Sequence, residues 1–464
     1  MKTKIAATLP GGFRDYPPSE MIARGKMLET IERVFRRFGF DPLKTPGMEL
    51  ESTLTGDDPE FGMIIYRTGL SRGRVAVEPT ALRFDLTIPL ARFMAANPDL
   101  PKPFKRYQTG DVWRGEKPQA GRFREFTQFD ADTVGSASML ADAEIIALMV
   151  ETMRELVGNS FKVRFNNRKV LNGLPALANF NEGLLTQVLK IIDKLPKIGS
   201  DAVLRELGRP RRDQVEPEEE GADQVEQQYG AGLSSASVET IAKFLAIEGD
   251  SAAMLDQVAD LFRDVEIASL GVSELREIVD ALQAMNVPST NLMFDLSIAR
   301  GLSYYTGPVF ETFLDDLPQI GSVFSGGRYD GLVNRFMDGN IPAVGASVGV
   351  DRLFAALTML DRLSKTITVT QVFITIMDQN YRNECLRIAG ELRASGISTM
   401  VWFGQDTATR AQISYATRQQ IPVVIFYGGN EAETQTVAVK DMNARKQTSV
   451  PRAQVVEFVR SILK

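Results

Sequence analysis

The chain has 464 residues, of which 44 % are hydrophobic and 24 % are charged, with a net charge of −6, and this length predicts two or three domains. No stretch approaches the roughly 18 consecutive apolar residues of a membrane helix, which excludes a membrane-spanning protein, and the N-terminus has no apolar signal core. The sequence contains no histidine and one cysteine, Cys385, which excludes a Ser-His-Asp triad, a His-ligated zinc site and an internal disulfide, and predicts a cytoplasmic protein.

The first 170 residues predict a mixture of helices and strands. Apolar residues recur at helical spacing after Pro18, and Gly39 ends the predicted helix. A second, long apolar helix is predicted at 141–156. Strands are predicted at residues 74–77, 82–87, 105–112, 123–134 and 161–165.

Residues 171–285 are rich in Leu, Ala and Glu, which predicts a mostly helical segment with an acidic, solvated loop at 216–220. Strand patterns return at 291–298 and 304–313, and a helix is predicted from Gly349. After residue 363 a regular alternation predicts a compact α/β domain, with strands at 372–376, 398–402, 423–426 and 436–440 and helices at 381–394 and 407–418.

The charge is unevenly distributed along the chain. Residues 371–464 hold 11 Lys and Arg against 8 Asp and Glu, so this segment is basic while the rest of the chain is acidic. A basic segment of this kind permits a phosphate-bearing partner such as a nucleic acid.

Three short clusters place charged residues inside otherwise apolar, strand-rich sequence. The first is 82–87 (LRFDLT), which on a strand would put Arg83, Asp85 and Thr87 on one face. The second spans 112–132 and predicts a hairpin. The third is 300–307 (RGLSYYTG). The even positions of the second hairpin strand share a face and are Arg122, Arg124, Phe126, Gln128, Asp130 and Asp132.

Each cluster taken alone could be a solvated sheet face or a ladder of cross-strand salt bridges. The three clusters together favour a binding site instead. Carboxylates bind an ammonium group, and arginines bind a carboxylate or a phosphate through paired hydrogen bonds, so the clusters suit a zwitterion beside a polyphosphate. The sequence has no Gly-x-x-x-x-Gly-Lys-Ser/Thr motif, so side chains would hold the phosphates.

Several segments resemble the class II aminoacyl-tRNA synthetases, and in particular the histidyl-tRNA synthetases. Residues 12–16 (GFRDY) resemble the N-terminal signature of that family, and 38–46 resemble motif 1, which builds the dimer interface. Residues 114–124 resemble motif 2, and residues 345–353 (GASVGVDRL) resemble motif 3. The segments most specific to the histidyl family are 299–307 (ARGLSYYTG) and 326–332 (GGRYDGL).

This resemblance implies a fold and a function. The fold would be an α+β catalytic domain with a mixed antiparallel sheet, a helical insertion and a C-terminal α/β domain. The protein would be a homodimer that activates histidine with ATP to histidyl-adenylate and transfers it to the 3′ end of tRNA(His). Mg²⁺ would accompany the ATP phosphates, and the protein itself would hold no metal. The expected segments are 1–160 and 288–362 for the catalytic domain, 161–287 for the insertion, 363–370 for a linker and 371–464 for the anticodon-binding domain.

The resemblance also implies roles for single residues. Arg300 would stand beside the α-phosphate of ATP, and Arg114 would bridge this phosphate and the substrate carboxylate, which makes both catalytic. The implied histidine-binding residues are Asp85, Leu86, Thr87, Arg114, Gln128, Asp132, Arg300, Tyr304 and Tyr305. The implied ATP-binding residues are Arg114, Glu116, Arg122, Phe126 and Arg352.

Two related protein classes are weighed against this interpretation. The regulatory subunit of ATP phosphoribosyltransferase resembles the catalytic domain, but it usually lacks a C-terminal α/β domain and the motif arginines, whereas Arg114 and Arg352 are present here. A different class II synthetase conflicts with segments 299–307 and 326–332. We therefore favour a histidyl-tRNA synthetase.

Overall fold

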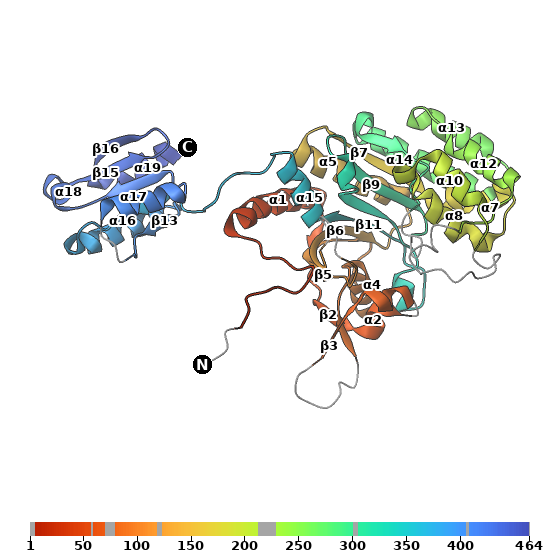
Figure 1. Ribbon diagram of the computed structural model, residues 1–464, viewed down its shortest axis with the longest axis horizontal. Helices are drawn as coiled ribbons and strands as arrows, with labels where there is room; N and C mark the ends of the chain where they lie inside the picture. Colours follow the sequence, from red (N-terminus) through yellow and green to blue (C-terminus); the bar gives the residue numbers. More distant parts are fainter. Residues whose placement is uncertain are drawn as a thin grey trace. The chain divides into compact units, whose positions relative to one another are not determined.

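The computed structural model describes residues 5–56, 59–69, 79–117, 123–211, 229–299, 305–404 and 408–463. The chain divides into two compact units, one formed by Met1–Arg14 with Glu29–Arg362 and the other by Asp15–Leu28 with Leu363–Lys464. Each unit has its own β-sheet with helices packed against it (Figure 1). Within the described ranges, no helix is long and apolar enough to cross a membrane.

An eight-stranded mixed sheet forms the centre of the first unit, with the strand order β1-β5-β6-β11-β10-β9-β7-β8 (Figure 1). Neighbouring strands are antiparallel except for the parallel pairs β1–β5 and β7–β8 at the two edges. The strands are β1 (Asp41–Pro42), β5 (Phe104–Trp113), β6 (Glu125–Val134), β7 (Phe161–Asn167), β8 (Leu292–Phe294), β9 (Pro308–Leu314), β10 (Phe324–Arg328) and β11 (Ala343–Gly349). A small second sheet has the order β2-β4-β3 and contains β2 (Met48–Leu50), β3 (Tyr66–Thr68) and β4 (Thr80–Leu82).

Helix α1 spans Pro18–Arg37, and apolar side chains of its part in the first unit, from Glu29 onward, cover one face of the large sheet. The ring of Phe35 is fully buried, with its centroid 5.0 Å from that of Phe129 on β6 and 6.4 Å from that of Tyr107 on β5. Helix α5 (Met139–Val157) packs on β7, β9, β10 and β11. These contacts bury the apolar face of the sheet and leave its opposite face for other side chains.

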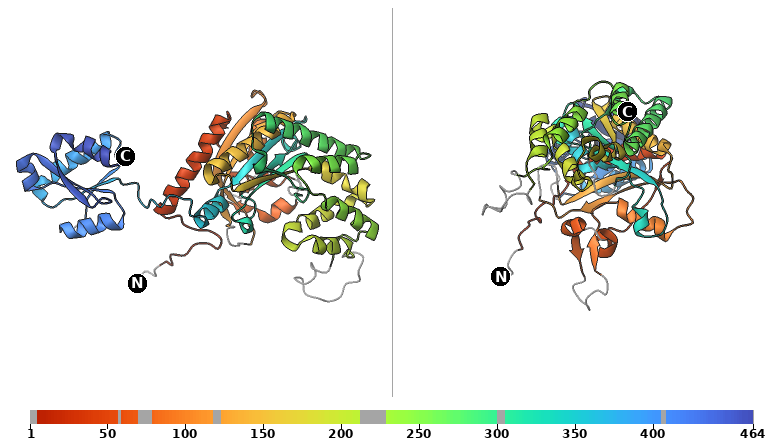
Figure 2. Two further views of the ribbon diagram at one scale, coloured as in Figure 1. Left: turned by 90° about the horizontal axis from the view of Figure 1, so that it is seen from above. Right: turned by 90° about the vertical axis from the view of Figure 1, so that its right-hand side faces the viewer.

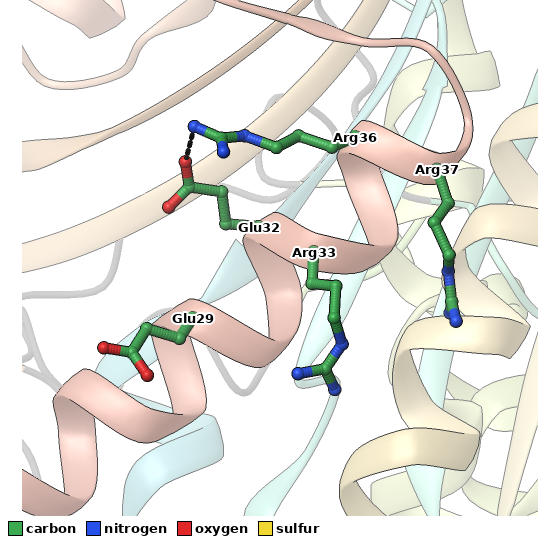
Figure 3. A pocket seen from close by; sticks show the side chains of 5 residues that line it. All are labelled: Glu29, Glu32, Arg33, Arg36 and Arg37. Carbon is green, nitrogen blue, oxygen red and sulfur yellow. Dashed lines mark ion pairs between the residues drawn. The ribbon is translucent and has the colours of Figure 1, made fainter.

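Charged residues fill the outer side of α1. Arg33 and Arg37 each lie 2.5 Å from a carboxylate oxygen of Glu155 on α5, so ion pairs link the two helices. Glu32 pairs with Arg36 one turn away at 2.6 Å (Figure 3). With Glu29 these α1 residues line a surface hollow that contains none of the site residues expected from the sequence.

A set of helices follows β7 (Figure 2). Helix α14 packs on α5, α6 and α13, whereas α10 packs on α8, α9 and α12, and α12 also packs on α7. The predicted helical middle of the chain is therefore confirmed for the described residues, while the acidic loop at 216–220 lies outside them. These helices are α6 (Arg168–Asn172), α7 (Leu174–Ala178), α8 (Leu185–Ile192), α9 (Leu195–Ile198), α10 (Ser200–Gly208), α12 (Ser235–Leu245), α13 (Ser251–Leu261) and α14 (Glu266–Ala284). The other helices of the unit are α2 (Glu51–Thr55), α3 (Pro59–Ile64), α4 (Thr87–Ala96) and α15 (Val350–Met359).

The second unit contains the predicted α/β domain. Its five-stranded sheet has the order β13-β12-β14-β15-β16, with parallel pairs on both sides of β12 and antiparallel pairs beyond β14. The strands are β12 (Val372–Ile374), β13 (Thr399–Val401), β14 (Val423–Phe426), β15 (Thr436–Asp441) and β16 (Lys446–Pro451). The helices are α16 (Arg382–Ala394), α17 (Thr409–Arg418), α18 (Gly429–Thr434) and α19 (Val455–Leu463). Strand β16 and helices α18 and α19 were not among the predicted elements.

The expected fold class is confirmed, but two predicted strands are wrong in part. The strand expected at 82–87 ends at Leu82, and helix α4 begins at Thr87. The physical reason is that Asp85 Oδ1 accepts a hydrogen bond from the backbone N–H of Ile88 at 3.1 Å and so satisfies a free N–H in the first helical turn. The strand expected at 291–298 is limited to β8, and the one expected at 74–77 lies outside the described residues.

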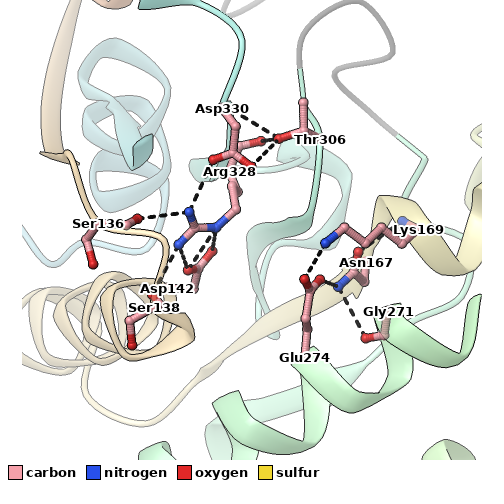
Figure 4. Close-up of polar contacts among 10 residues, drawn as sticks. All are labelled: Ser136, Ser138, Asp142, Asn167, Lys169, Gly271, Glu274, Thr306, Arg328 and Asp330. Atoms are coloured by element: carbon pink, nitrogen blue, oxygen red, sulfur yellow. Dashed lines mark hydrogen bonds and ion pairs between the residues drawn. The ribbon is translucent and has the colours of Figure 1, made fainter. Parts of the chain in front are cut away.

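A buried ion pair fixes the end of strand β10 to helix α5. Arg328 donates to Asp142, whose side chain is fully buried, and its Nη1 also donates to the carbonyl of Ser136 at 3.0 Å (Figure 4). Burial raises the pKa of Asp142 to about 6, while Arg328 opposes that rise. The carbonyl of Arg328 accepts from the N–H of Thr306, so the pair also supports the chain just before β9.

We expect Asp142→Asn to lower the free energy of unfolding of the first unit by about 3–5 kcal/mol, because the buried Arg328 guanidinium would lose its fully buried counter-charge and keep only the partly exposed Asp330 at 3.2 Å. The double variant Asp142→Asn with Arg328→Met should recover part of the loss, since it removes the buried guanidinium and leaves only the partly exposed Asp330 without this partner. Thermal and urea unfolding of the three proteins measure this. A single variant as stable as the parent would show that the ion pair does not hold β10 on α5.

Candidate functional site

A row of four residues crosses the large sheet on the face opposite to α1. Strand pairing places Arg106 of β5 beside Asp132 of β6, Asp132 beside Gly345 of β11, and Gly345 beside Gly327 of β10. Residues directly paired across strands project from the same face. The row therefore carries a cation and an anion at one end and two residues without side chains at the other.

The two glycines make room for the functional side chains of this row. A Cβ on Gly345 would lie 1.9 Å from Asp132 Oδ1, and a Cβ on Gly327 would lie 2.9 Å from the ring of Tyr305. No other residue type fits at either position unless its neighbour moves. The hydroxyl of Tyr329 donates a hydrogen bond to Asp132 Oδ1. Asp132 and Tyr305 were both expected from the sequence. The structure places Asp132 against Gly345 and Tyr305 against Gly327, and these two glycines are neighbours in the sheet.

Arg106 connects this row to a second group of expected site residues. Its side chain has no exposed surface, and its Nη2 lies 2.8 Å from Asp132 Oδ2 and 4.0 Å from Asp130 Oδ2. The same Nη2 donates to the carbonyl oxygen of Leu86 at 3.2 Å. Arg106 therefore contacts Asp132 and the segment of Asp85, Leu86 and Thr87 at once.

Asp85 lies at the start of helix α4 rather than on a strand. The backbone N–H groups of Ile88 and Thr87 hold its carboxylate, which fixes it beside the helix N-terminus. Burial raises the pKa of Asp85, and those N–H groups together with the Arg114 guanidinium oppose the rise. A carboxylate in this position can accept hydrogen bonds from an ammonium group.

Arg114 directly follows β5 and contacts Phe84 and Phe126, of which Phe126 was expected at the site. Its Nε donates to the carbonyl of Phe84 at 3.0 Å, and its guanidinium carbon lies 5.1 Å from the ring centroid of Phe126. Such stacking keeps a guanidinium flat and leaves its outer N–H groups available for an anion. Arg114 and Phe126 therefore form one unit next to Asp85.

Strand β6 is also tied to the start of helix α15, where Arg352 lies. The N–H of Thr127 donates to Asp351 Oδ2 at 2.7 Å, and Gln128 Nε2 donates to Ser347 Oγ at 2.8 Å. Arg352 Nη1 donates to the carbonyl of Ser322 at 2.6 Å. Gln128 and Arg352 are thus held by strand β11 and the turn before β10.

One described site residue, Glu116, is not connected to these groups, and three others fall outside the described ranges. The side chain of Glu116 is exposed, and its backbone carbonyl accepts from Arg124 at 3.1 Å. The other three, Arg122, Arg300 and Tyr304, lie outside the described residues. Arg106, Tyr329 and Gly345 were missed as site residues by the sequence analysis. The signal for Arg106 was its position opposite Asp132 in the predicted hairpin.

The two aspartates of β6 share a single neighbouring guanidinium. Asp130 and Asp132 are both almost fully buried. Burial raises the pKa of Asp130 to about 7, because Arg106 offsets only part of the cost and Asp132 adds repulsion. Burial raises the pKa of Asp132 as well, and Arg106 and Tyr329 oppose that rise.

We expect Asp130→Asn to make the protein less sensitive to pH. A carboxyl group with a pKa of about 7 when folded and 3.8 otherwise contributes stability below pH 4 that is lost as the pH rises through 7. The variant should therefore gain roughly 1 to 3 kcal/mol relative to the parent between pH 5 and pH 8. Unfolding at four pH values measures this, with exposed Asp99→Asn as the control. A constant difference between Asp130→Asn and the parent would contradict it.

Comparison with known proteins gives a consistent result along the chain. A family model described as histidyl-tRNA synthetase matches residues 12–353, and one described as an anticodon binding domain matches residues 371–462. A histidine–tRNA ligase of Paracoccus denitrificans is 40 % identical, covering 98 % of this chain and 97 % of its own length. One from Aeropyrum pernix is 38 % identical and covers 98 % of both chains.

Solved structures agree with the sequence comparison. The crystal structure of a histidyl-tRNA synthetase from Nostoc sp. has a TM-score of 0.84 and 32 % identity, covering 99 % of this chain and all of that one. A Bacillus halodurans structure described as an ATP phosphoribosyltransferase regulatory subunit/histidyl-tRNA synthetase is 22 % identical with a TM-score of 0.72, over 92 % of this chain and all of that one, and shares the fold. The chain belongs to the histidyl-tRNA synthetase family.

Proposed function

We propose that this chain is a histidine–tRNA ligase that activates histidine with ATP and transfers it to the 3′ end of tRNA(His). The observation that carries the proposal is the row of Arg106, Asp132, Gly345 and Gly327 across the sheet, with Asp132 beside Arg106, in a chain of the histidyl-tRNA synthetase family. This row offers a buried acceptor for a ring N–H group. The neighbouring Asp85 offers an acceptor for an ammonium group.

The histidine would lie between these two groups. Asp132 and Tyr305, together with Tyr304, would bind the two imidazole nitrogens, because a neutral imidazole needs one acceptor and one donor. The ammonium group would bind Asp85, Thr87 and Gln128. The contact of Arg106 with both Leu86 and Asp132 supports this arrangement, since it fixes the two ends of the site to each other.

ATP would bind next to the histidine carboxylate. The stacking of Arg114 on Phe126 supports a role for both, with Arg114 bridging the histidine carboxylate and the α-phosphate. Glu116 would contact the adenine, and Arg352 and Arg122 would bind the nucleotide and its terminal phosphates. Mg²⁺ would enter with the ATP phosphates and neutralise part of their charge.

The chemical step needs no side-chain nucleophile. The histidine carboxylate attacks the α-phosphorus, pyrophosphate leaves, and negative charge gathers on the phosphoryl oxygens. Arg300 and Arg114 would stabilise that charge more in the transition state than in the bound substrates. The lack of histidine in the chain is compatible with this mechanism, because no imidazole base is required.

The remaining expectations concern the partner and the assembly. The anticodon-binding family match at 371–462, with its basic charge, supports contact of residues 371–464 with tRNA(His). Residues 38–46 would build the interface of a homodimer in the cytoplasm. A regulatory subunit without ligase activity is the second candidate, but that C-terminal match and the presence of Arg114 favour the ligase.

We expect histidine, and no other amino acid, to support ATP–pyrophosphate exchange by the purified protein. The physical reason is that a buried Asp132 and Tyr305 lose their hydrogen bonds with any side chain that lacks two ring nitrogens, and such a mismatch costs a factor of roughly 10⁴ or more. The exchange rate is measured with each of the twenty amino acids. Exchange with a different amino acid, or with none, would contradict the proposed function.

We expect Arg300→Ala to slow adenylate formation by roughly 10²-fold or more, because the variant loses one preorganised charge partner of the α-phosphate. The affinity for histidine should change much less, since other residues bind the ammonium and the ring. Single-turnover activation and calorimetry of histidine binding separate the two effects. A folded variant with a near-normal activation rate would remove Arg300 from the catalytic residues.

A further inference from the structure

Arg106 is a buried cation placed where two parts of the site meet. It has no exposed surface, and its Nη2 contacts both the carbonyl oxygen of Leu86 at 3.2 Å and Asp132 Oδ2 at 2.8 Å. The two contacts belong to different segments, because Leu86 immediately precedes α4 and Asp132 lies on β6. A planar guanidinium can hold both in a fixed geometry, which a lysine ammonium on a flexible chain cannot do.

The contacts leave one oxygen of Asp132 open to a ligand. Tyr329 donates to Oδ1. Oδ2 is buried, and the described residues donate no hydrogen bond to it, because Arg106 Nη2 at 2.8 Å forms an ion pair with it without hydrogen-bond geometry. A buried carboxylate oxygen without a donor is costly in the free protein. A ligand N–H placed there would remove this cost, so a ligand that carries this N–H would bind more tightly than one that lacks it.

The charge on Asp132 is essential to that role. A carboxylate accepts hydrogen bonds on both oxygens, whereas a protonated carboxyl group would present a donor to the ring. Asp130 lies on the same strand face and competes for the same guanidinium, at 4.0 Å. Arg106 is thus the nearest positive charge that keeps Asp132 in its accepting form.

We propose that Arg106 is a positioning residue for histidine selection, which acts through Asp132 and Leu86 and does not itself contact the substrate. It holds the acceptor for the imidazole N–H at a fixed place relative to the helix that binds the ammonium group. This inference rests on the proposed function. The alternative is that Arg106 only stabilises the sheet by pairing with two buried aspartates.

The test compares Arg106→Met, Arg106→Lys, Asp132→Asn and the double variant Arg106→Met with Asp132→Asn. Binding of L-histidinol is measured by calorimetry, because this probe keeps the ammonium and imidazole groups but lacks the carboxylate. ATP–pyrophosphate exchange gives the KM values for histidine and ATP. Arg83→Met is the matched control, since Arg83 is also buried but donates to the carbonyl oxygens of Thr45 and Asp111 instead.

Arg106→Met should weaken histidinol binding and raise the KM for histidine by roughly 10-fold or more, while the KM for ATP stays within about 2-fold. The double variant should lose less histidinol affinity than the product of the two single losses, since Arg106 acts in part through Asp132. Arg106→Lys should show a smaller loss, because the charge remains and one of the two contacts is lost. Arg83→Met should lower the melting temperature and leave the ratio of histidinol to ATP affinity unchanged.

Three results would overturn the inference. Histidinol affinity could be unchanged in Arg106→Met, the losses in Arg106→Met and Asp132→Asn could multiply, or the KM values for histidine and ATP could rise together. If Arg106→Met does not fold, the histidinol affinity of Arg106→Lys is measured instead. An affinity equal to that of the parent would contradict the inference. A parent enzyme without histidine-dependent exchange would instead contradict the proposed function itself.

Discussion

One guanidinium shared by two buried carboxylates is the interaction on which the candidate site depends. Arg106, Asp130 and Asp132 carry charge in the middle of an eight-stranded sheet, where burial of an unpaired charge costs several kcal/mol. Because there are two anions and one cation, the group is not neutral when both carboxyls are ionised. The cluster therefore contributes little to the stability of the fold, but it suits a ligand that brings further hydrogen-bond donors.

One face of the large sheet packs against helices, and the other face carries the candidate site. The face under α1 and α5 is packed with rings such as Phe35 and Phe129, which set the position of the strands. The other face carries the charged row and the glycines. The Arg328–Asp142 pair lies on the α5 side, yet its backbone holds Thr306 next to Tyr305, so packing on one face supports the ligand side chains on the other (Figure 4).

The sequence predicted β5, β6 and β7 of the large sheet and four of the five strands of the C-terminal domain because their apolar alternation is local, but it did not predict β10 or β11. It also singled out Asp132 and Arg114 as candidate site residues, through their place in a hairpin and through family resemblance. It failed at 82–87, where strand-like alternation was overridden by the hydrogen bond from Ile88 to Asp85 that begins α4. Tyr329 was missed because its contact with Asp132 joins segments 197 residues apart, which a local pattern does not contain. Arg106 was missed although it pairs with Asp132 within the predicted hairpin.

The row from Arg106 to Gly327 is built entirely from the pairing register of four strands. A shift of one residue in β5 or β6 would turn Arg106 or Asp132 to the packed face, and a shift in β11 would place a side chain where Gly345 leaves room for Asp132. Insertions and deletions are thus incompatible with β5, β6, β10 and β11. The helices after β7 and the hairpin tip do not take part in this pairing. Over evolutionary time, length changes should accumulate in those segments, while the four strands keep constant lengths.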